Sequence, residues 1–216
     1  MCPALNGGRK RIALTKGETS AERILAAAKA EFLKLGFEKA SIRAIAAQVG
    51  MTSAGLYRHF RNKEEMFSAL VEPTIAECTA RFETEKANDY ALLAKDQLEE
   101  MWSNSSGLAM LLNVIYENFD AFKLLLCCSE GTKYADFTHE FVSMEQQETL
   151  AYLEAARAKG IPVNDVKPEE MHLLLSAYSA AVFEIVVHDF TKTEAEHYAQ
   201  TLITFFVPGW RAVLGI

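Results

Sequence analysis

The sequence predicts an all-α protein in which an N-terminal three-helix, helix-turn-helix domain precedes a larger helical domain. Apolar residues recur at helical spacing along most of the chain, and no segment alternates as a half-buried strand does. Charge is also unevenly distributed. Residues 1–71 contain 12 Lys and Arg against 6 Asp and Glu, whereas residues 72–216 contain 10 against 23. The chain therefore joins a basic head to an acidic body.

The basic head begins with a segment unlike the rest of the chain. Residues 1–17 hold a cluster of cations and two adjacent glycines, which indicates a flexible basic arm. Thr19 and Glu22 then have the spacing of a capping box, in which each side chain accepts a hydrogen bond from the other residue's backbone N–H. The expected first domain covers residues 18–66, and its first helix runs from Thr19 to Gly36. Two short helices follow over 42–48 and 53–60. Ser41 and Thr52 are their expected caps, and Gly50 forms the turn between them.

The remaining chain, residues 67–216, reads as a helical bundle. Asn62 caps a long helix, and turn residues near Gly131, Gly160 and Thr191 punctuate the segments that follow. Pro208 is expected to kink or end the last helix. The expected helices of the body cover residues 63–88, 90–103, 107–127, 133–159, 168–189 and 193–214.

Other features bound the class of protein. No apolar stretch follows the N-terminal cations as in a secretory signal, and the apolar run over 173–183 is shorter than the roughly 20 residues of a membrane span. The histidines lack metal-ligand spacing, and no nucleophile–base pair or phosphate-binding glycine loop is present. Adjacent Cys127 and Cys128 could sense oxidants or bind a soft metal, or could be small buried apolar residues. We expect a cytoplasmic protein without membrane contact, metal, cofactor or enzymatic activity.

The second short helix of the head carries the chemistry expected of a DNA reader. A helix that enters the major groove needs small or polar residues in its first turn, and Ser53, Ala54 and Gly55 meet that need. Large polar side chains follow at Tyr57, Arg58 and His59. The alternatives are a plain helix start with a mildly unfavourable glycine, and a solvated polar face.

Two cations of the head also suggest contact with DNA. Lys63 lies at a helix N-terminus, where a cation opposes the helix dipole unless an anion binds nearby. Arg43, in the first turn of its helix, can reach bases or the DNA backbone, with an intramolecular salt bridge as the alternative. The basic arm could add phosphate or minor-groove contacts, or be a solubilising tail.

The segment containing these residues resembles the TetR family of transcriptional regulators. The matching residues are Ile45-Ala46, the turn at Gly50, Leu56-Tyr57-Arg58-His59-Phe60 and Asn62-Lys63-Glu64, with Met51 as a local departure. The strong resemblance covers about residues 19–70. It implies phosphate contacts by Ser41, Tyr57, His59 and Lys63, and base contacts by Arg43, Ser53, Ala54 and Arg58.

The resemblance also implies a homodimer, formed by the last two helices. The segment 168–189 is apolar nearly all round, and the final helix adds further large apolar residues, so both are more easily covered if they pair with a second copy. The residues expected at the dimer interface are Leu174, Ala177, Ala181, Leu202, Phe206 and Trp210.

A small-molecule site is implied among the middle helices. Aromatic and methionine side chains with few charges suit an apolar or aromatic effector, although such residues can equally form core. The expected pocket residues are Trp102, Met110, Tyr116, Phe119, Phe137, Phe141, Met144 and Tyr178. The sequence therefore predicts a repressor that binds palindromic double-stranded operator DNA and is released by an unknown effector. Transcriptional activation and a pure interaction bundle are the alternatives.

Overall fold

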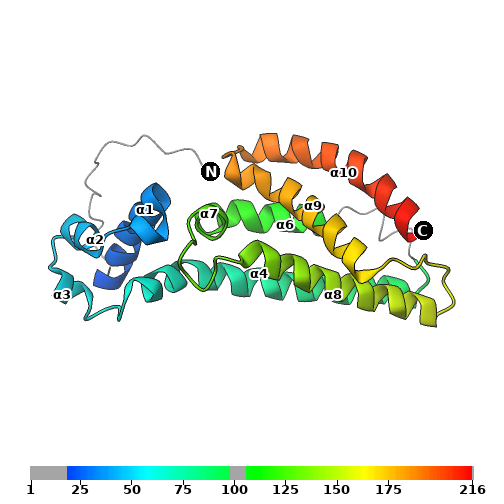
Figure 1. The fold of residues 1–216 in the computed structure, drawn as a ribbon, viewed down its shortest axis with the longest axis horizontal. Coiled ribbons are helices and arrows are strands. Elements are labelled where there is room, and N and C mark those ends of the chain that lie inside the picture. Colours follow the sequence, from blue (N-terminus) through cyan, green and yellow to red (C-terminus); the bar gives the residue numbers. More distant parts are fainter. Residues whose placement is uncertain (1–18, 98–105, 216) are drawn as a thin grey trace. The chain divides into compact units, whose positions relative to one another are not determined.

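The computed structural model describes residues 19–97 and 106–215, and every regular element in these ranges is a helix, which confirms the all-α prediction (Figure 1). The predicted arm over 1–17 and the pocket candidate Trp102 lie outside the described residues. The helices are α1 (Ser20–Lys39), α2 (Ile42–Gln48), α3 (Ser53–Leu56), α4 (Lys63–Ala94), α6 (Ser106–Glu117), α7 (Phe119–Cys127), α8 (Phe137–Ala158), α9 (Pro168–Val187) and α10 (Lys192–Leu214).

These helices form two compact units. Unit 1 combines the described part of residues 1–76 with residues 118–135, and unit 2 combines residues 77–117 with the described part of 136–216. Unit 1 is therefore larger than the helix-turn-helix segment predicted over 18–66, because it also contains the first turns of α4 and all of α7.

The first helix follows its sequence signals closely. Thr19 Oγ1 accepts a hydrogen bond from Glu22 N–H, and the Glu22 carboxylate accepts one from Thr19 N–H at 2.7 Å, so the predicted capping box is present. Gly36 has φ 75°, which breaks the regular helix where the sequence predicted its end. Helical backbone resumes for one short turn beyond that kink, and α1 therefore extends to Lys39.

Unit 1 is held together by an aromatic core. Phe32 and Phe67 are fully buried, with ring centroids 5.4 Å apart, and Phe37 packs on both at 5.7 and 5.5 Å. Burial of each such ring contributes about 1.5–3 kcal/mol relative to exposure. Ile45 on α2 and Leu56 on α3 are also fully buried, so the apolar faces predicted for the short helices are the buried ones, and α2 packs against both α1 and α3.

The short helices turn at Gly50, which has φ 70°. α2 has the predicted bounds, but α3 ends at Leu56, four residues before its predicted end. His59 N–H donates to the carbonyl oxygen of Leu56 at 2.9 Å, so the chain closes into a turn after one helical repeat. Tyr57, Arg58 and His59 thus lie on this turn and not along a continuing helix.

Three other boundaries differ from the predictions. α4 continues unbroken to Ala94, where two helices over 63–88 and 90–103 were predicted, so the turn-forming residues near 89 are incorporated into the helix. The single helix predicted over 107–127 is divided at Asn118, whose φ of −130° is not helical. α8 begins at Phe137, four residues after its predicted start, because residues 132–135 form turns instead.

Unit 2 is a helical bundle made of the second half of α4 with α6, α8, α9 and α10. α9 packs against both α8 and α10 (Figure 1). One core cluster brings together Val142 and Leu153 of α8, Met171 and Leu175 of α9, and Leu214 of α10. The predicted all-round apolar character of α9 is thereby explained in part by burial within one chain.

Helix α9 is also long and apolar enough to cross a membrane by length and composition, contrary to the expectation from residues 173–183 alone. The difference arises because the helix continues beyond this run, through Ile185, Val186 and Val187. Length and composition do not separate a membrane span from a core helix. Here Met171, Leu175, Val182 and Val186 are buried inside the bundle, as in a core helix.

Candidate nucleic-acid interface and internal cavity

The outer surface of α2, α3 and the turn after α3 carries most of the predicted DNA-contacting residues. The buried side chains Ile45, Leu56 and Phe60 hold this segment on the core of unit 1. Between these anchors the helical repeat directs the polar residues outward. Ser41, Arg43, Ala54, Tyr57, Arg58 and His59 are all exposed, with Tyr57 at 48 %.

The large polar side chains on this surface have no partners among the residues that the structure describes. Among the described residues, none forms a hydrogen bond or ion pair with the side chain of Arg43, Tyr57, Arg58 or His59. The intramolecular salt bridge considered for Arg43 is therefore absent from the described part of unit 1. An exposed phenol, an imidazole and two guanidinium groups are left available for an external acceptor such as phosphate or a base edge.

Ser53 and Gly55, the other predicted contacts, are partly buried at the start of α3. Thr52 Oγ1 caps this helix by accepting a hydrogen bond from Gly55 N–H at 3.1 Å. A Cβ atom added to Gly55 would lie 3.4 Å from Thr52 Oγ1, an ordinary van der Waals distance, and the backbone at Gly55 does not have positive φ. The fold of the chain itself therefore does not require glycine at this position.

Lys63 has a different setting from the one the resemblance implied. Its Nζ donates to the carbonyl oxygens of Phe37 at 2.6 Å, Glu38 at 3.1 Å and Ala40 at 3.2 Å, and lies 4.3 Å from the centroid of the Phe37 ring. An ammonium group has three N–H donors, so these carbonyl groups use all of them. Burial lowers the pKa of Lys63, and the nearby Glu38 carboxylate opposes that shift.

This arrangement gives Lys63 contacts inside the chain that the sequence did not predict, and its phosphate contact stays a prediction. Its ammonium donates to carbonyl groups at the end of α1, and so joins the end of α1 to the start of α4. The helix-dipole argument identified Lys63 as unusual but could not reveal that its acceptors in the chain are neutral carbonyl oxygens. We therefore expect Lys63 to help hold the helix-turn-helix segment in position by linking α1 to α4.

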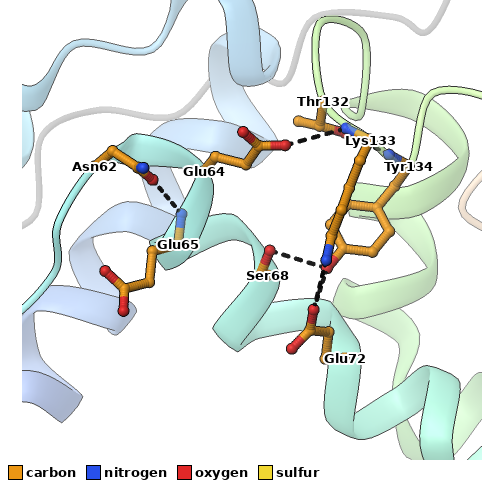
Figure 2. Close-up of polar contacts among 8 residues, drawn as sticks. All are labelled: Asn62, Glu64, Glu65, Ser68, Glu72, Thr132, Lys133 and Tyr134. Carbon is orange, nitrogen blue, oxygen red and sulfur yellow. Dashed lines mark hydrogen bonds and ion pairs between the residues drawn. The ribbon is translucent and has the colours of Figure 1, made fainter.

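The start of α4 is capped as predicted. Asn62 Oδ1 accepts a hydrogen bond from Glu65 N–H at 2.7 Å, and the Glu65 carboxylate accepts one from Arg61 N–H. Both contacts satisfy backbone donors at the helix N-terminus. Figure 2 shows the Asn62 contact at the first turn of the helix.

A second set of polar contacts ties α4 to the segment that follows α7 (Figure 2). Lys133 N–H donates to Glu64 Oε1 at 3.3 Å, and Lys133 Nζ lies 2.9 Å from Glu72 Oε1. Tyr134 OH lies 2.7 Å from the same Glu72 oxygen and 2.9 Å from Ser68 Oγ. Sequence analysis missed this cluster because its members lie more than 60 residues apart and show no local pattern.

Unit 2 contains a partly open cavity of about 270 Å³. Side chains from α4, α6, α8, α9 and α10 line it, and most are aliphatic or aromatic. Phe141 and Tyr178, both predicted pocket residues, are among them. The aromatic members of the wall are Phe82, Phe141, Tyr178, Phe183, Phe206 and Trp210.

The other predicted pocket residues lie elsewhere. Tyr116 OH donates to the carbonyl oxygens of Phe190 at 2.7 Å and Thr191 at 3.1 Å, so it links α6 to the turn before α10. Phe137 packs on the cavity residue Phe183, with ring centroids 6.3 Å apart, and does not itself line the cavity. Met110 and Met144 are partly buried outside the lining, and Phe119 belongs to unit 1.

Three residues predicted for the dimer interface line the cavity instead. Leu202, Phe206 and Trp210 all contribute to its wall, and Leu202 is only 5 % exposed. The helical repeat of α10 shows which of its residues share a face. It does not show which face packs inside the subunit and which is exposed. Of the remaining predicted interface residues, Leu174 and Ala177 are exposed and Ala181 is partly buried.

The exposed apolar residues of unit 2 concentrate on its last two helices. Leu173 on α9 is 68 % exposed and Phe205 on α10 is 76 % exposed, while Leu174 and Val213 are exposed to lesser degrees.

The cysteines of the described chain are not in disulfides. Burial raises the pKa of Cys78 to about 11, which disfavours its reactive thiolate. Cys128 is buried, and Cys127 is partly buried. No cluster of three or more potential metal ligands occurs among the residues that the structure describes.

Comparison with known proteins gives one family match and several similar folds. Residues 24–70 match the family model described as "Bacterial regulatory proteins, tetR family". Salmonella enterica GusR is 20% identical, with a TM-score of 0.51 over 94% of this chain and 99% of that one. NalD of Pseudomonas aeruginosa, the secondary repressor of the MexAB-OprM multidrug efflux pump, is 18% identical, with a TM-score of 0.50 over 85% of this chain and 93% of that one. No curated protein is significantly similar in sequence.

Proposed function

The chain belongs to the TetR family of bacterial regulatory proteins through its N-terminal domain, and we propose that it represses transcription by binding a palindromic operator as a homodimer. A small molecule in the cavity of unit 2 then releases it from the operator. This function places the protein in the cytoplasm, with double-stranded DNA, a second copy and the effector as its partners.

One observation carries the DNA-binding part of the proposal. Arg43, Tyr57, Arg58 and His59 are exposed together on the helix-turn-helix segment, without side-chain partners among the described residues. Elsewhere in the described chain many cations are paired, as Lys29 is with Asp120 and Lys86 with Glu148. Unpaired cations beside a tyrosine and a histidine on a small-residue helix suit the phosphates and base edges of a major groove.

The dimer part of the proposal rests on the exposed apolar surface of α9 and α10. Palindromic operators are read by two recognition helices about one helical turn of DNA apart, which a two-fold dimer supplies. Leu173 and Phe205 are the most exposed large apolar residues described, and covering them would contribute to association. The interface proposed here therefore uses Leu173, Leu174, Ala177 and Phe205, and omits the cavity residues of α10.

DNA binding is tested by selecting sequences from a random duplex pool and measuring affinity by fluorescence anisotropy at several salt concentrations. Arg58→Ala is expected to weaken binding and, where Arg58 meets a phosphate, to lower the salt slope by about one. Lys95→Ala is the matched control, because Lys95 is an exposed cation of unit 2. A pool that yields no enriched sequence would contradict the proposal and favour an interaction bundle.

Dimerisation is tested by light scattering after size exclusion. Phe205→Asp is expected to convert a dimer to a monomer, because a charge would be buried at the interface. Leu35→Asp is the control, since Leu35 is an exposed apolar residue of unit 1 (41 %). A wild-type monomer, or a dimer unaffected by Phe205→Asp, would contradict the proposed interface.

A further inference from the structure

One carboxyl group opens into the otherwise mostly apolar cavity of unit 2. Glu145 on α8 belongs to the cavity wall, together with the rings of Phe82, Phe141, Tyr178 and Trp210. A carboxylate among aromatic rings costs free energy unless a partner compensates its charge. Its presence in this wall therefore calls for an explanation other than packing.

The chain supplies no such partner in the parts that the structure describes. No lysine, arginine or histidine of residues 19–97 and 106–215 forms an ion pair with Glu145, and no hydrogen bond to its side chain occurs there. Residues 98–105 contain no lysine, arginine or histidine in their sequence. Lys86 on α4 is paired with Glu148, which lies three residues after Glu145, at 2.8 Å.

The charges that act on Glu145 are negative. Burial is the main cause that raises its pKa, to about 7, and the carboxylates of Glu148 and Asp89 raise it further. Asp89 is itself affected by burial and by Glu85, and its pKa is raised to about 6. Burial and these neighbouring carboxylates therefore disfavour the charged form of Glu145, and no ion pair to Glu145 itself occurs among the described residues.

We propose that the cavity binds a lipophilic monocation, whose charged nitrogen lies against the Glu145 carboxylate and whose apolar body lies among the aromatic rings. This inference deepens the proposed function, because it names the chemical class of the effector. A cation restores the charge balance that burial of the carboxylate disturbs. The aromatic faces also attract a positive charge, most strongly where water is excluded.

The volume of the cavity limits the ligand to a small one. About 270 Å³ is near the lower end of ligand sites, which span roughly 300–1,000 Å³. A single aromatic ring with a short ammonium-bearing group is compatible with that size. Benzyltrimethylammonium is a suitable probe, and neopentylbenzene is its neutral counterpart, in which carbon replaces nitrogen.

The decisive experiment compares these two probes by isothermal titration calorimetry on the full chain. The cation is expected to bind at least about tenfold more tightly than the neutral compound, and Glu145→Gln should remove most of that preference. Glu154→Gln is the matched control, since Glu154 is an exposed residue of the same helix, and it should leave the preference unchanged. Unfolding temperatures of both variants establish that they are folded.

A measurement on the unaltered chain keeps the test independent of the variants. Near pH 6.5 Glu145 is partly protonated, so binding of a permanent cation should release protons from it. The buffer takes up the released protons, so the measured binding enthalpy should change with the ionisation enthalpy of the buffer. Asp89 on α4, Glu148 on α8 and Tyr178 on α9 are the titratable groups nearest to this event, and Asp89 would contribute to the same proton release.

The outcomes separate this inference from the proposed function. Equal affinities for the two probes, a preference that survives Glu145→Gln, or no binding of the cation in the millimolar range would each overturn the inference. The DNA-binding assay is run separately on the same samples. If the cation binds through Glu145 but leaves DNA affinity unchanged, the ligand class stands and the proposed release mechanism fails.

Discussion

Lys63 Nζ lies 2.6 Å from the carbonyl oxygen of Phe37, and this contact joins the end of α1 to the start of α4. The same ammonium also meets the carbonyls of Glu38 and Ala40. The first helix of the head and the helix that leads away from it therefore share one cation. Because α2 and α3 lie between them in the chain, we expect the position of the proposed DNA-contacting surface to depend on this contact.

The first prediction concerns Lys63→Ala. Removal of the ammonium leaves its carbonyl acceptors without this partner, and we expect unfolding free energy to fall by roughly 1–2 kcal/mol. DNA affinity should fall through displacement of α3, while the salt slope stays unchanged because no phosphate contact is lost. Chemical denaturation and salt-dependent anisotropy measure the two effects. A slope lowered by about one at unchanged stability would support the phosphate role for Lys63.

The second prediction concerns Gly55→Ala. A Cβ atom at this position has ordinary space inside the chain, so the fold should be retained and stability should rise by as much as about 1 kcal/mol. If DNA approaches α3 closely, the added methyl group will weaken operator binding without unfolding the protein. Thermal unfolding and anisotropy on the selected operator measure both. Unchanged DNA affinity would indicate that the first turn of α3 lies away from the groove.

The third prediction concerns Tyr134→Phe. Tyr134 is only 7 % exposed, and its hydroxyl meets Ser68 Oγ and Glu72 Oε1, while its ring packs on Phe67 with centroids 5.9 Å apart. Loss of the hydroxyl alone should lower unfolding free energy by about 1 kcal/mol. Tyr57→Phe is the control, because that hydroxyl has no partner in the described chain. Equal stability of the two variants would show that the contacts of Figure 2 are not stabilising.

The head of this protein could be predicted from sequence further than its body. Capping residues and glycines act locally, so the start of α1 and the cap at Asn62 were predictable. The bounds of α2 were also as predicted, but the Ser41 side chain makes no capping hydrogen bond there. Exposure of Tyr57 also followed, since neighbouring apolar residues define the buried face. The end of α3 did not follow, because it depends on a turn that closes after Leu56.

In residues 67–216, the sequence pattern identified the apolar helices. It did not identify whether their apolar side chains line a cavity, pack in the core or lie at an interface. Phe206 and Trp210 satisfy the same periodicity whether they line a cavity or an interface, and the distinction depends on how α10 packs against α9. Glu145 was missed for a related reason. A single glutamate in a helix with many polar residues is unremarkable until the fold places it among aromatic rings.

The last prediction concerns the pH dependence of stability at Glu145. Its pKa is about 7 in the folded chain, against an ordinary value of 4.5, so the folded state binds the extra proton between those values. Stability from this group is therefore present at low pH and is lost as pH rises through about 7. Glu145→Gln should raise unfolding free energy by roughly 1–3 kcal/mol at pH 8, with much less effect at pH 5. Urea denaturation at both values, with Glu154→Gln as control, measures the difference. An equal effect at both pH values would mean that the carboxyl is not held in its neutral form by burial.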